Sequence, residues 1–355
     1  MDFSFTPEQE AARREYDKFF EEVMKDAPDH WMGTLDDLFM TEDGAQFHRN
    51  VASKMAERGW LTLPWPEEYG GQGKGAVDLF ILMESQHSHG APGLQAHAVT
   101  MLGGSIIQFG TDEQKKRLLP QLGSGKIKVA QGWSEPNAGS DIASLTTRAV
   151  EDGDEFIING QKTWSSGARH ADWYYLPART DATLRRHRGL SYFLIEDLNA
   201  PGITRRPVYS MNGQYFWDEV FFDDVRIPRR NLIGEIGQGW RVILHDAEQE
   251  RLEQPVFIGE AQYHFRQLLD YCKETKRDGV LLSKNPIIRH RLADLAIDIE
   301  LARDMMYWMA AVVDKGEMAP QYISVAIVVM HSVQGKLGRL GIDALGHWGE
   351  VKYGS

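Results

Sequence analysis

Cysteine is almost absent from this sequence, since Cys272 is the only one in 355 residues. A disulfide framework within the chain is therefore excluded, and the composition fits a reducing cytoplasm. No stretch approaches the ~18 consecutive apolar residues that a membrane-spanning helix needs. The first residues, MDFSFTPE, lack the basic start and apolar core of a signal peptide. We therefore expect a cytoplasmic protein with no membrane partner.

Positive charge is also scarce. Lys and Arg number 39 against 51 Asp and Glu, which gives a formal net charge of -12. Proteins bind phosphate backbones through an excess of Lys and Arg, so this balance argues against a nucleic-acid partner.

Several motifs of common active sites are missing. No Gly-x-Gly-x-x-Gly segment marks a Rossmann nicotinamide site, and no nucleophile elbow supports Ser-His-Asp catalysis. His87 and His89 have no carboxylate or cysteine at metal-ligand spacing. We expect no metal site, and we expect both histidines on a helix surface.

Helix signals dominate the first ~125 residues. Thr6 and Thr111 are each followed three residues later by a glutamine, which predicts two helix N-termini closed by capping boxes. Further helices are expected over residues 43–58 and 75–90.

From about residue 126 the pattern changes to β-rich runs separated by turn signals. The predicted strands cover 129–130, 156–158, 173–176, 190–195 and 220–222. After Gly239 the helical period returns, and helices are expected over 240–273, 286–313 and 320–345.

These changes predict an α+β fold in three parts. A helical N-terminal domain covers 1–127, a middle antiparallel β-barrel or sandwich covers 128–237, and a C-terminal helical bundle covers 238–355.

Two sequence blocks carry the strongest chemical signal. Residues 131–141, QGWSEPNAGSD, combine hydroxyl groups with a turn whose small side chains let a ligand approach the backbone. Residues 159–167, NGQKTWSSG, begin with an Asn-Gly pair that predicts a two-residue hairpin turn, and the returning strand carries Trp164. Each block alone is equally consistent with an ordinary turn or hairpin. The pair in this order indicates a flavin pocket.

Further segments in the same order extend this pattern along the chain. They include WPEEYGG at 65–71, FGTDEQK at 109–115, EVFFDDVRIP at 219–228, NLIG at 231–234 and GQGW at 237–240. Together with the two blocks, they resemble the acyl-CoA dehydrogenase family over nearly the whole chain. The stretch Lys276-Arg277-Asp278-Gly279 resembles the branch of that family that handles bulky, branched or steroid acyl groups.

The resemblance implies an FAD-dependent enzyme that converts an acyl-CoA thioester to the trans-2-enoyl-CoA. A carboxylate removes the α-proton while the β-hydrogen leaves as hydride to flavin N5. The residues that the resemblance assigns to FAD are Gln131, Trp133, Ser134, Ser140, Trp164, Ser165 and Ser166. Ser140 and Arg251 are also assigned to the substrate.

The resemblance places the catalytic base at one of two positions. The first lies in a loop near the C-terminus, where Tyr353 occupies the usual glutamate position and Glu350 comes too early. The second lies on the helix after the β-domain and matches Glu250. Glu250 is therefore the expected base. Its alternative role is that of a solvated helix carboxylate.

Two departures from the family pattern bear on the cofactor. Thr275 stands where many members have an arginine that reaches the FAD pyrophosphate of a neighbouring subunit. Arg277 or Lys276 could substitute for it, and the alternative is that these cations are solvated or compensate a helix dipole. The C-terminal domain also looks incomplete, because a Gly-Gly-Thr-Ser-Glu-Ile-like turn that touches FAD would follow Ser355.

Three alternatives stay open at this point. One is an acyl-CoA oxidase on the same fold. Another is a non-catalytic partner subunit of a heteromeric acyl-CoA dehydrogenase. The third is a nucleic-acid-binding relative, which the negative charge disfavours. The implied partners are acyl-CoA, electron-transferring flavoprotein as acceptor, and either identical subunits in a dimer or tetramer or a second subunit type in a heterotetramer.

Overall fold

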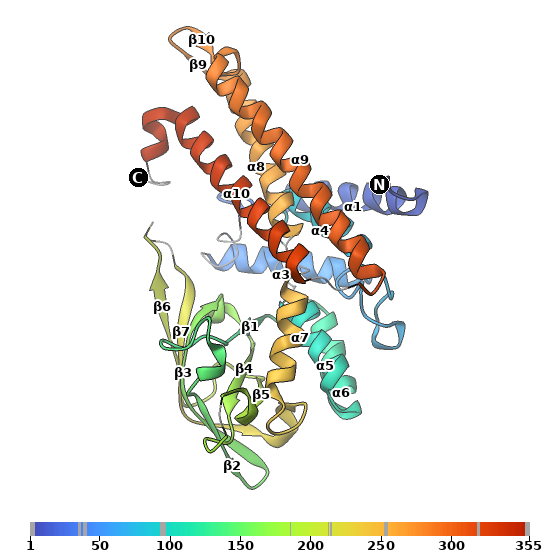
Figure 1. The fold of residues 1–355 in the computed structure, drawn as a ribbon, viewed down its shortest axis with the longest axis vertical. Coiled ribbons are helices and arrows are strands. Elements are labelled where there is room, and N and C mark those ends of the chain that lie inside the picture. The colour runs from blue at the N-terminus through green and yellow to red at the C-terminus, as the bar shows by residue number, and fades with distance from the viewer. Residues whose placement is uncertain are drawn as a thin grey trace.

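The computed structural model describes residues 4–34, 37, 41–92, 97–184, 186–211, 213, 215–251, 255–317 and 320–351. Within these ranges the chain runs from helices through a β-sheet and back to helices (Figure 1). The predicted α+β fold is confirmed.

The N-terminal part consists of helices packed around large aromatic side chains. Both predicted capping boxes are present, at the starts of the first and last of these helices. The helices are α1 (Pro7–Val23), α3 (Glu42–Ala56), α4 (Ala76–Ser88), a π-helical segment (His97–Gly103), α5 (Gly104–Phe109) and α6 (Asp112–Gly123).

The middle part is one sheet in the order β6-β7-β3-β2-β4-β5-β8, with β1 paired to β4. Its strands are β1 (Val129–Gln131), β2 (Arg148–Asp152), β3 (Glu155–Ser166), β4 (Trp173–Arg179), β5 (Leu190–Ile195), β6 (Ile203–Tyr209), β7 (Tyr215–Pro228) and β8 (Leu232–Ile233). Most pairs are antiparallel, while β1 and β2 pair with β4 in parallel. The strand path does not close on itself, so the sheet is sandwich-like and the closed-barrel alternative is wrong.

The C-terminal part is again helical. It comprises α7 (Gly239–Arg251), α8 (Pro255–Glu274), a small hairpin of β9 (Lys276–Arg277) and β10 (Val280–Leu281), α9 (Pro286–Asp314) and α10 (Pro320–Leu345). The prediction of a helix over 240–273 falls on α7 and α8, and residues 252–254 between them lie outside the described residues. Helix α7 lies beside α5 and β5, whereas α8 to α10 extend away from the sheet (Figure 1).

One local prediction fails. Asn159-Gly160 is no turn but lies inside β3, where Asn159 exchanges two hydrogen bonds of 2.9 Å with Asp224 on β7. Gly160 is required there because a Cβ atom would lie 2.5 Å from the Thr147 hydroxyl oxygen. The hairpin turn falls earlier, at Gly153 between β2 and β3, where φ is +63°.

The N- and C-terminal helices share one hydrophobic core, which joins Phe20 of α1 and Phe80 of α4 to Leu295 and Met306 of α9. The sheet has its own core around Phe156. No helix in the described ranges has the length and apolar character to cross a bilayer. The prediction that His87 lies on a surface is wrong, since it is buried on α4 against Gly259 of α8.

A buried carboxylate connects four helices of this shared core. Glu84 on α4 accepts hydrogen bonds from Tyr307 of α9 at 2.6 Å and Gln262 of α8 at 2.8 Å. Arg303 of α9 forms a two-pronged ion pair with it, and Arg13 of α1 lies 3.9 Å away. Burial raises the pKa of Glu84, but Arg303 and Tyr307 lower it overall. The carboxylate therefore holds the N- and C-terminal helices together as a charged group.

Replacing Arg303 with methionine should lower the free energy of unfolding by about 3 kcal/mol, because Glu84 would keep its buried charge without its main cation. Denaturant unfolding followed by far-UV circular dichroism measures this loss. Lys273→Met is the control, since its ion pair with Asp270 is exposed on both sides and should contribute under about 1 kcal/mol. Equal losses in the two variants would contradict the assignment.

Candidate functional site

The first sequence block starts on β1 and continues into a turn beside the sheet. Gln131 pairs in parallel with Tyr175 of β4, and the next residue, Gly132, donates its backbone N–H to the Tyr175 carbonyl at 2.9 Å. A Cβ atom at Gly132 would lie 1.9 Å from the Tyr174 hydroxyl, so glycine is required for this close packing. The side-chain nitrogen of Gln131 is buried and has no hydrogen-bond partner among the described residues. A buried donor without a partner is uncommon and calls for an explanation such as a bound ligand or water.

The second block forms the end of β3, where the pairing with β7 shifts register between Lys162 and Ser165. Trp164 lies in this irregular stretch with a φ of +59° and leaves 56% of its surface exposed. Its ring packs edge-on against Trp217 at 5.6 Å between centroids. A bulky residue with positive φ is strained, and such residues concentrate at functional sites. The bulge therefore presents an aromatic face that a planar ligand can cover.

A buried ion pair joins the two blocks. The Lys162 ammonium lies 2.9 Å from the Glu135 carboxylate and donates a further hydrogen bond of 3.1 Å to the Trp133 carbonyl. Glu135 also accepts the backbone N–H groups of Thr146 and Thr147 at 2.6 and 2.9 Å. The two blocks are thus fixed to each other by two side chains that are both buried.

The environment of this pair sets both ionisation states. Burial raises the pKa of Glu135, but Lys162 and the donors of Thr146 and Thr147 outweigh it and bring the pKa to about 2. Burial lowers the pKa of Lys162 to about 8, against the opposing effect of Glu135. Both groups are charged at neutral pH. Sequence reasoning missed both as site residues, although each lies inside a quoted block.

The remaining predicted cofactor residues differ in what their side chains face. The Ser165 hydroxyl is buried and bonded to the Tyr174 hydroxyl at 2.6 Å, so this side chain serves the sheet interior. The Trp133 indole donates to the Tyr192 hydroxyl at 2.9 Å. Ser134 is half-buried and its carbonyl accepts the Thr163 N–H at 2.9 Å. Ser166 is half-buried, and Ser140 is exposed.

Helix α7 carries the predicted base. Glu250 lies in its last turn and is exposed, and Arg251 beside it is half-buried. The protein atoms around the Glu250 carboxyl raise its pKa through burial, and the Asp246 carboxylate adds to this rise, while Arg251 opposes it. A general base benefits from a pKa raised toward neutral pH. Asp246, one turn earlier and fully buried, is a further residue that sequence reasoning missed.

Two further predictions concern the C-terminal position of the base and the cation that would replace the missing arginine. Tyr353 lies outside the described residues, and Glu350 ends a short 3-10 helix that follows α10. Arg277 donates to the Ala344 carbonyl at 2.7 Å and so caps the end of α10, which occupies its guanidinium. The prediction that Arg277 replaces the missing pyrophosphate contact is therefore not supported by this geometry. Lys276 remains exposed on β9.

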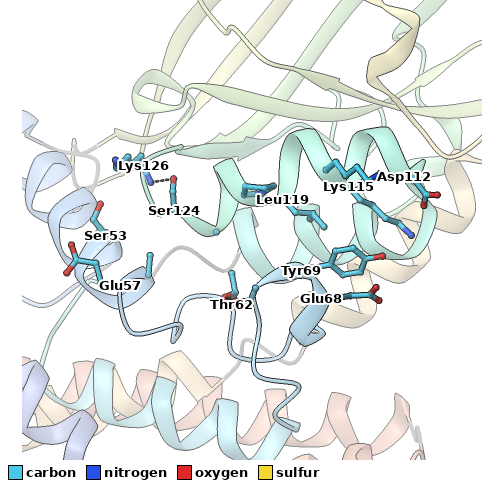
Figure 2. Close-up of a pocket in the computed structure, with 15 residues that line it drawn as sticks. Ser53, Glu57, Thr62, Glu68, Tyr69, Asp112, Lys115, Leu119, Ser124 and Lys126 are labelled. Atoms are coloured by element: carbon cyan, nitrogen blue, oxygen red, sulfur yellow. Dashed lines mark hydrogen bonds between the residues drawn. The ribbon is translucent and has the colours of Figure 1, made fainter.

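A cavity of about 990 Å³ lies elsewhere, between α3, the loop around Tyr69 and α6 (Figure 2). Within it the Lys115 ammonium sits 5.7 Å from the centre of the Tyr69 ring. Its lining mixes three acidic with three basic side chains and includes none of the predicted site residues. This balance of charge favours no class of ligand. Among the described residues, no three His, Cys, Asp or Glu side chains gather as a metal site would require.

Comparison with known families accounts for nearly the whole chain. Residues 6–126 match the N-terminal domain of acyl-CoA dehydrogenases, residues 130–225 match the middle domain, and residues 237–350 match the C-terminal domain. The acyl-CoA dehydrogenase FadE26 of Mycobacterium tuberculosis is 35% identical over 255 residues, which are 71% of this chain and 62% of FadE26. The aligned part is thus less than two thirds of that relative's length.

Solved structures show the same fold. A steroid ACAD, Tcur3481-Tcur3483, superposes with a TM-score of 0.87 at 29% identity, covering 100% of this chain and 89% of the other. The ChsE4-ChsE5 complex from Mycobacterium tuberculosis gives a TM-score of 0.85 at 30% identity, with the same two coverages. The arrangement of helical, β and helical parts is therefore that of the family.

Lys162→Met should lower the free energy of unfolding by about 3–5 kcal/mol, because the charge on Glu135 would stay buried without its partner. The double variant Lys162→Met/Glu135→Met should recover part of this loss, since no unpaired charge remains. Lys336→Met, which removes a more exposed pair with Asp298, is the control. A double variant no more stable than Lys162→Met would argue against the pair as the cause.

Acid should destabilise the protein through Glu135. The folded-state pKa of about 2 lies below the ordinary 4.5, so the contribution of Glu135 to stability is present above pH 4.5. It is lost as the pH falls toward 2, where the carboxylate takes up a proton. Thermal unfolding midpoints measured from pH 7 to pH 3 should fall less steeply in Glu135→Gln than in the wild type, even though the variant starts lower. Parallel curves would rule out Glu135 as a source of the acid dependence.

Proposed function

The chain belongs to the acyl-CoA dehydrogenase family, and from this premise we propose that it dehydrogenates an acyl-CoA thioester to the trans-2-enoyl-CoA. The observation that carries the proposal is that a chain matching all three family domains has an exposed aromatic face at Trp164 and a carboxylate of raised pKa at Glu250. FAD, when bound, supplies the acceptor for the hydride that leaves the β-carbon.

The residues present fit this cofactor. The exposed Trp164 ring offers a surface for a flat heterocycle, and the Gln131 side-chain nitrogen offers a hydrogen-bond donor on another strand of the same sheet. We assign FAD contacts to Gln131, Ser134, Trp164 and Ser166 through side chain or main chain. Trp133 and Ser165 act through their main chain and packing, because protein partners occupy their polar side-chain atoms.

Glu250 is the residue that removes the α-proton in this proposal. An α-proton beside a thioester is weakly acidic, so its removal needs a base whose pKa is raised and donors that stabilise the charge on the thioester oxygen. Arg251 adjoins Glu250 in the chain and moderates its pKa. We assign Arg251 and the exposed Ser140 to the acyl-CoA substrate.

The substrate class is a bulky or branched acyl group, with a steroid acyl-CoA as the leading case. Similarity to the steroid ACAD Tcur3481-Tcur3483 over the whole of this chain supports this choice. The Lys276-Arg277-Asp278-Gly279 stretch of that branch of the family also supports it. We expect the protein to work in the cytoplasm.

Assembly with further subunits is part of the proposal. Helices α9 and α10 expose large apolar side chains that include Ile297, Leu301, Val325, Val328 and Ile342. Exposed apolar groups on neighbouring helices are typical of subunit interfaces. The ChsE4-ChsE5 neighbour is a complex of two chain types, so a second dehydrogenase subunit is one candidate partner and an identical subunit is the other. Electron-transferring flavoprotein is the proposed electron acceptor.

An acyl-CoA oxidase and a non-catalytic subunit are the competing functions. Hydrogen peroxide released at a rate comparable to dye reduction would favour the oxidase. Loss of flavin when the chain is separated from a copurifying second subunit would favour the non-catalytic role.

Glu250→Gln should keep the flavin absorbance and acyl-CoA binding but lose reductive bleaching of the flavin by at least about a hundredfold, since the amide cannot take the α-proton. Stopped-flow absorbance with straight-chain, branched and steroid CoA thioesters measures this. Glu248→Gln removes an exposed carboxylate from the same helix and should bleach like the wild type. A fully active Glu250→Gln would move the base elsewhere.

A further inference from the structure

The Asp246 carboxylate lies at the meeting point of three elements and is fully shielded from solvent. One oxygen accepts a hydrogen bond from the Ser105 hydroxyl of α5, and the other accepts from the Tyr192 hydroxyl of β5. The ion pairs among the described residues bring no lysine or arginine to Asp246, and only the His245 ring comes near, at 3.8 Å. A buried carboxylate held by hydroxyls alone is costly for stability.

The hydrogen-bond directions around Asp246 follow from the number of protons. The Ser105 hydroxyl has one proton, which it donates to Asp246, so its contact of 3.2 Å with His245 Nδ1 has the ring as donor. The same reasoning makes the Tyr192 hydroxyl the donor to Asp246 and the acceptor of the Trp133 indole N–H at 2.9 Å. A continuous chain of donors thus leads from the first sequence block, through β5, to helix α7.

Asp246 and Glu250 are four residues apart on α7, and such residues lie on the same face of a helix. On this helix face Asp246 is fully buried, and Glu250 is exposed. We propose that Asp246 is a positioning residue, which anchors α7 to the cofactor-binding block through Tyr192 and to α5 through Ser105, and which acts on Glu250 by its nearby negative charge.

This inference rests on the proposed function only in taking Glu250 as the base. Two charged groups on α7 act on Glu250: the Asp246 carboxylate raises its pKa, and the Arg251 guanidinium lowers it. The titratable groups that face Asp246 are His245 on α7 and Tyr192 on β5. Burial and Asp246 raise the pKa of Tyr192 well above its ordinary value, so its hydroxyl stays protonated and keeps donating.

Asp246→Asn keeps the shape and removes the charge. Its expected effect is a shift of the Glu250 titration midpoint to lower pH by about 1 unit, because a like charge about one helical turn away no longer opposes ionisation. The acid limb of the kcat/KM profile should move by the same amount in the same direction. Infrared titration of the protonated carboxyl band that disappears in Glu250→Gln reads the midpoint without turnover.

Glu248→Gln is the matched control, since this carboxylate is exposed and two residues from Glu250, so it points away. It should leave the midpoint unchanged. An Asp246→Asn midpoint equal to that of the wild type would overturn the inference. Active Glu250→Gln together with a shifted Asp246→Asn midpoint would instead refute Glu250 as the base and leave its coupling to Asp246 standing.

Tyr192→Phe tests the anchoring separately and decides the matter if Asp246→Asn does not fold. It removes one donor from Asp246 and the acceptor of Trp133 while keeping the ring in place. We expect kcat to fall by about tenfold or more, with KM for acyl-CoA changed by less than about threefold, since misplacement of the base affects the chemical step. Unchanged kcat would overturn the positioning role.

Discussion

The buried ion pair between Lys162 and Glu135 is the interaction on which the site depends. It joins the turn that follows β1 to strand β3, and it does so with a lysine whose side chain has no exposed surface. The two partners keep their relative position, because moving either one would leave a buried charge uncompensated. The backbone N–H groups that Glu135 receives from Thr146 and Thr147 fix the carboxylate on a third segment as well. The relative position of the two blocks is therefore set before any ligand binds.

The other half of the site, helix α7, is fixed by different means. Its apolar side packs through Val242 and Ile243, and its polar side is held by Asp246 through hydroxyl groups of α5 and β5. Because Trp133 belongs to the first block and also donates to Tyr192, the two halves share a common set of hydrogen bonds. The position of Glu250 thus depends on the same β-domain residues that shape the proposed cofactor side.

Sequence patterns predicted the helix starts and the buried strands well, since capping boxes and apolar runs are local signals. They failed where tertiary contacts decide. The Asn159-Gly160 pair carries a turn signal, but its hydrogen bonds to Asp224 of β7 and its packing on Thr147 keep it inside a long strand. Asp246 had a sequence signal, its four-residue spacing from Glu250, but its burial comes from Ser105 and Tyr192, which are distant in sequence.

The conformation of Trp164 explains why so rigid a frame is useful. A bulky residue at φ +59° costs on the order of 1–3 kcal/mol, and more than half of its surface stays in water. Neither the positive φ nor the exposed ring stabilises the fold, so contacts of the surrounding residues must keep Trp164 in this conformation. Lys162 lies two residues before Trp164 and is tied to Glu135, while Ser165 directly after it is tied to Tyr174 in the sheet interior. Lys162 and Ser165 are both fixed, and the strand pairing shifts register between them, so Trp164 has no paired position in the sheet. Its ring faces outward, where a planar cofactor can cover it.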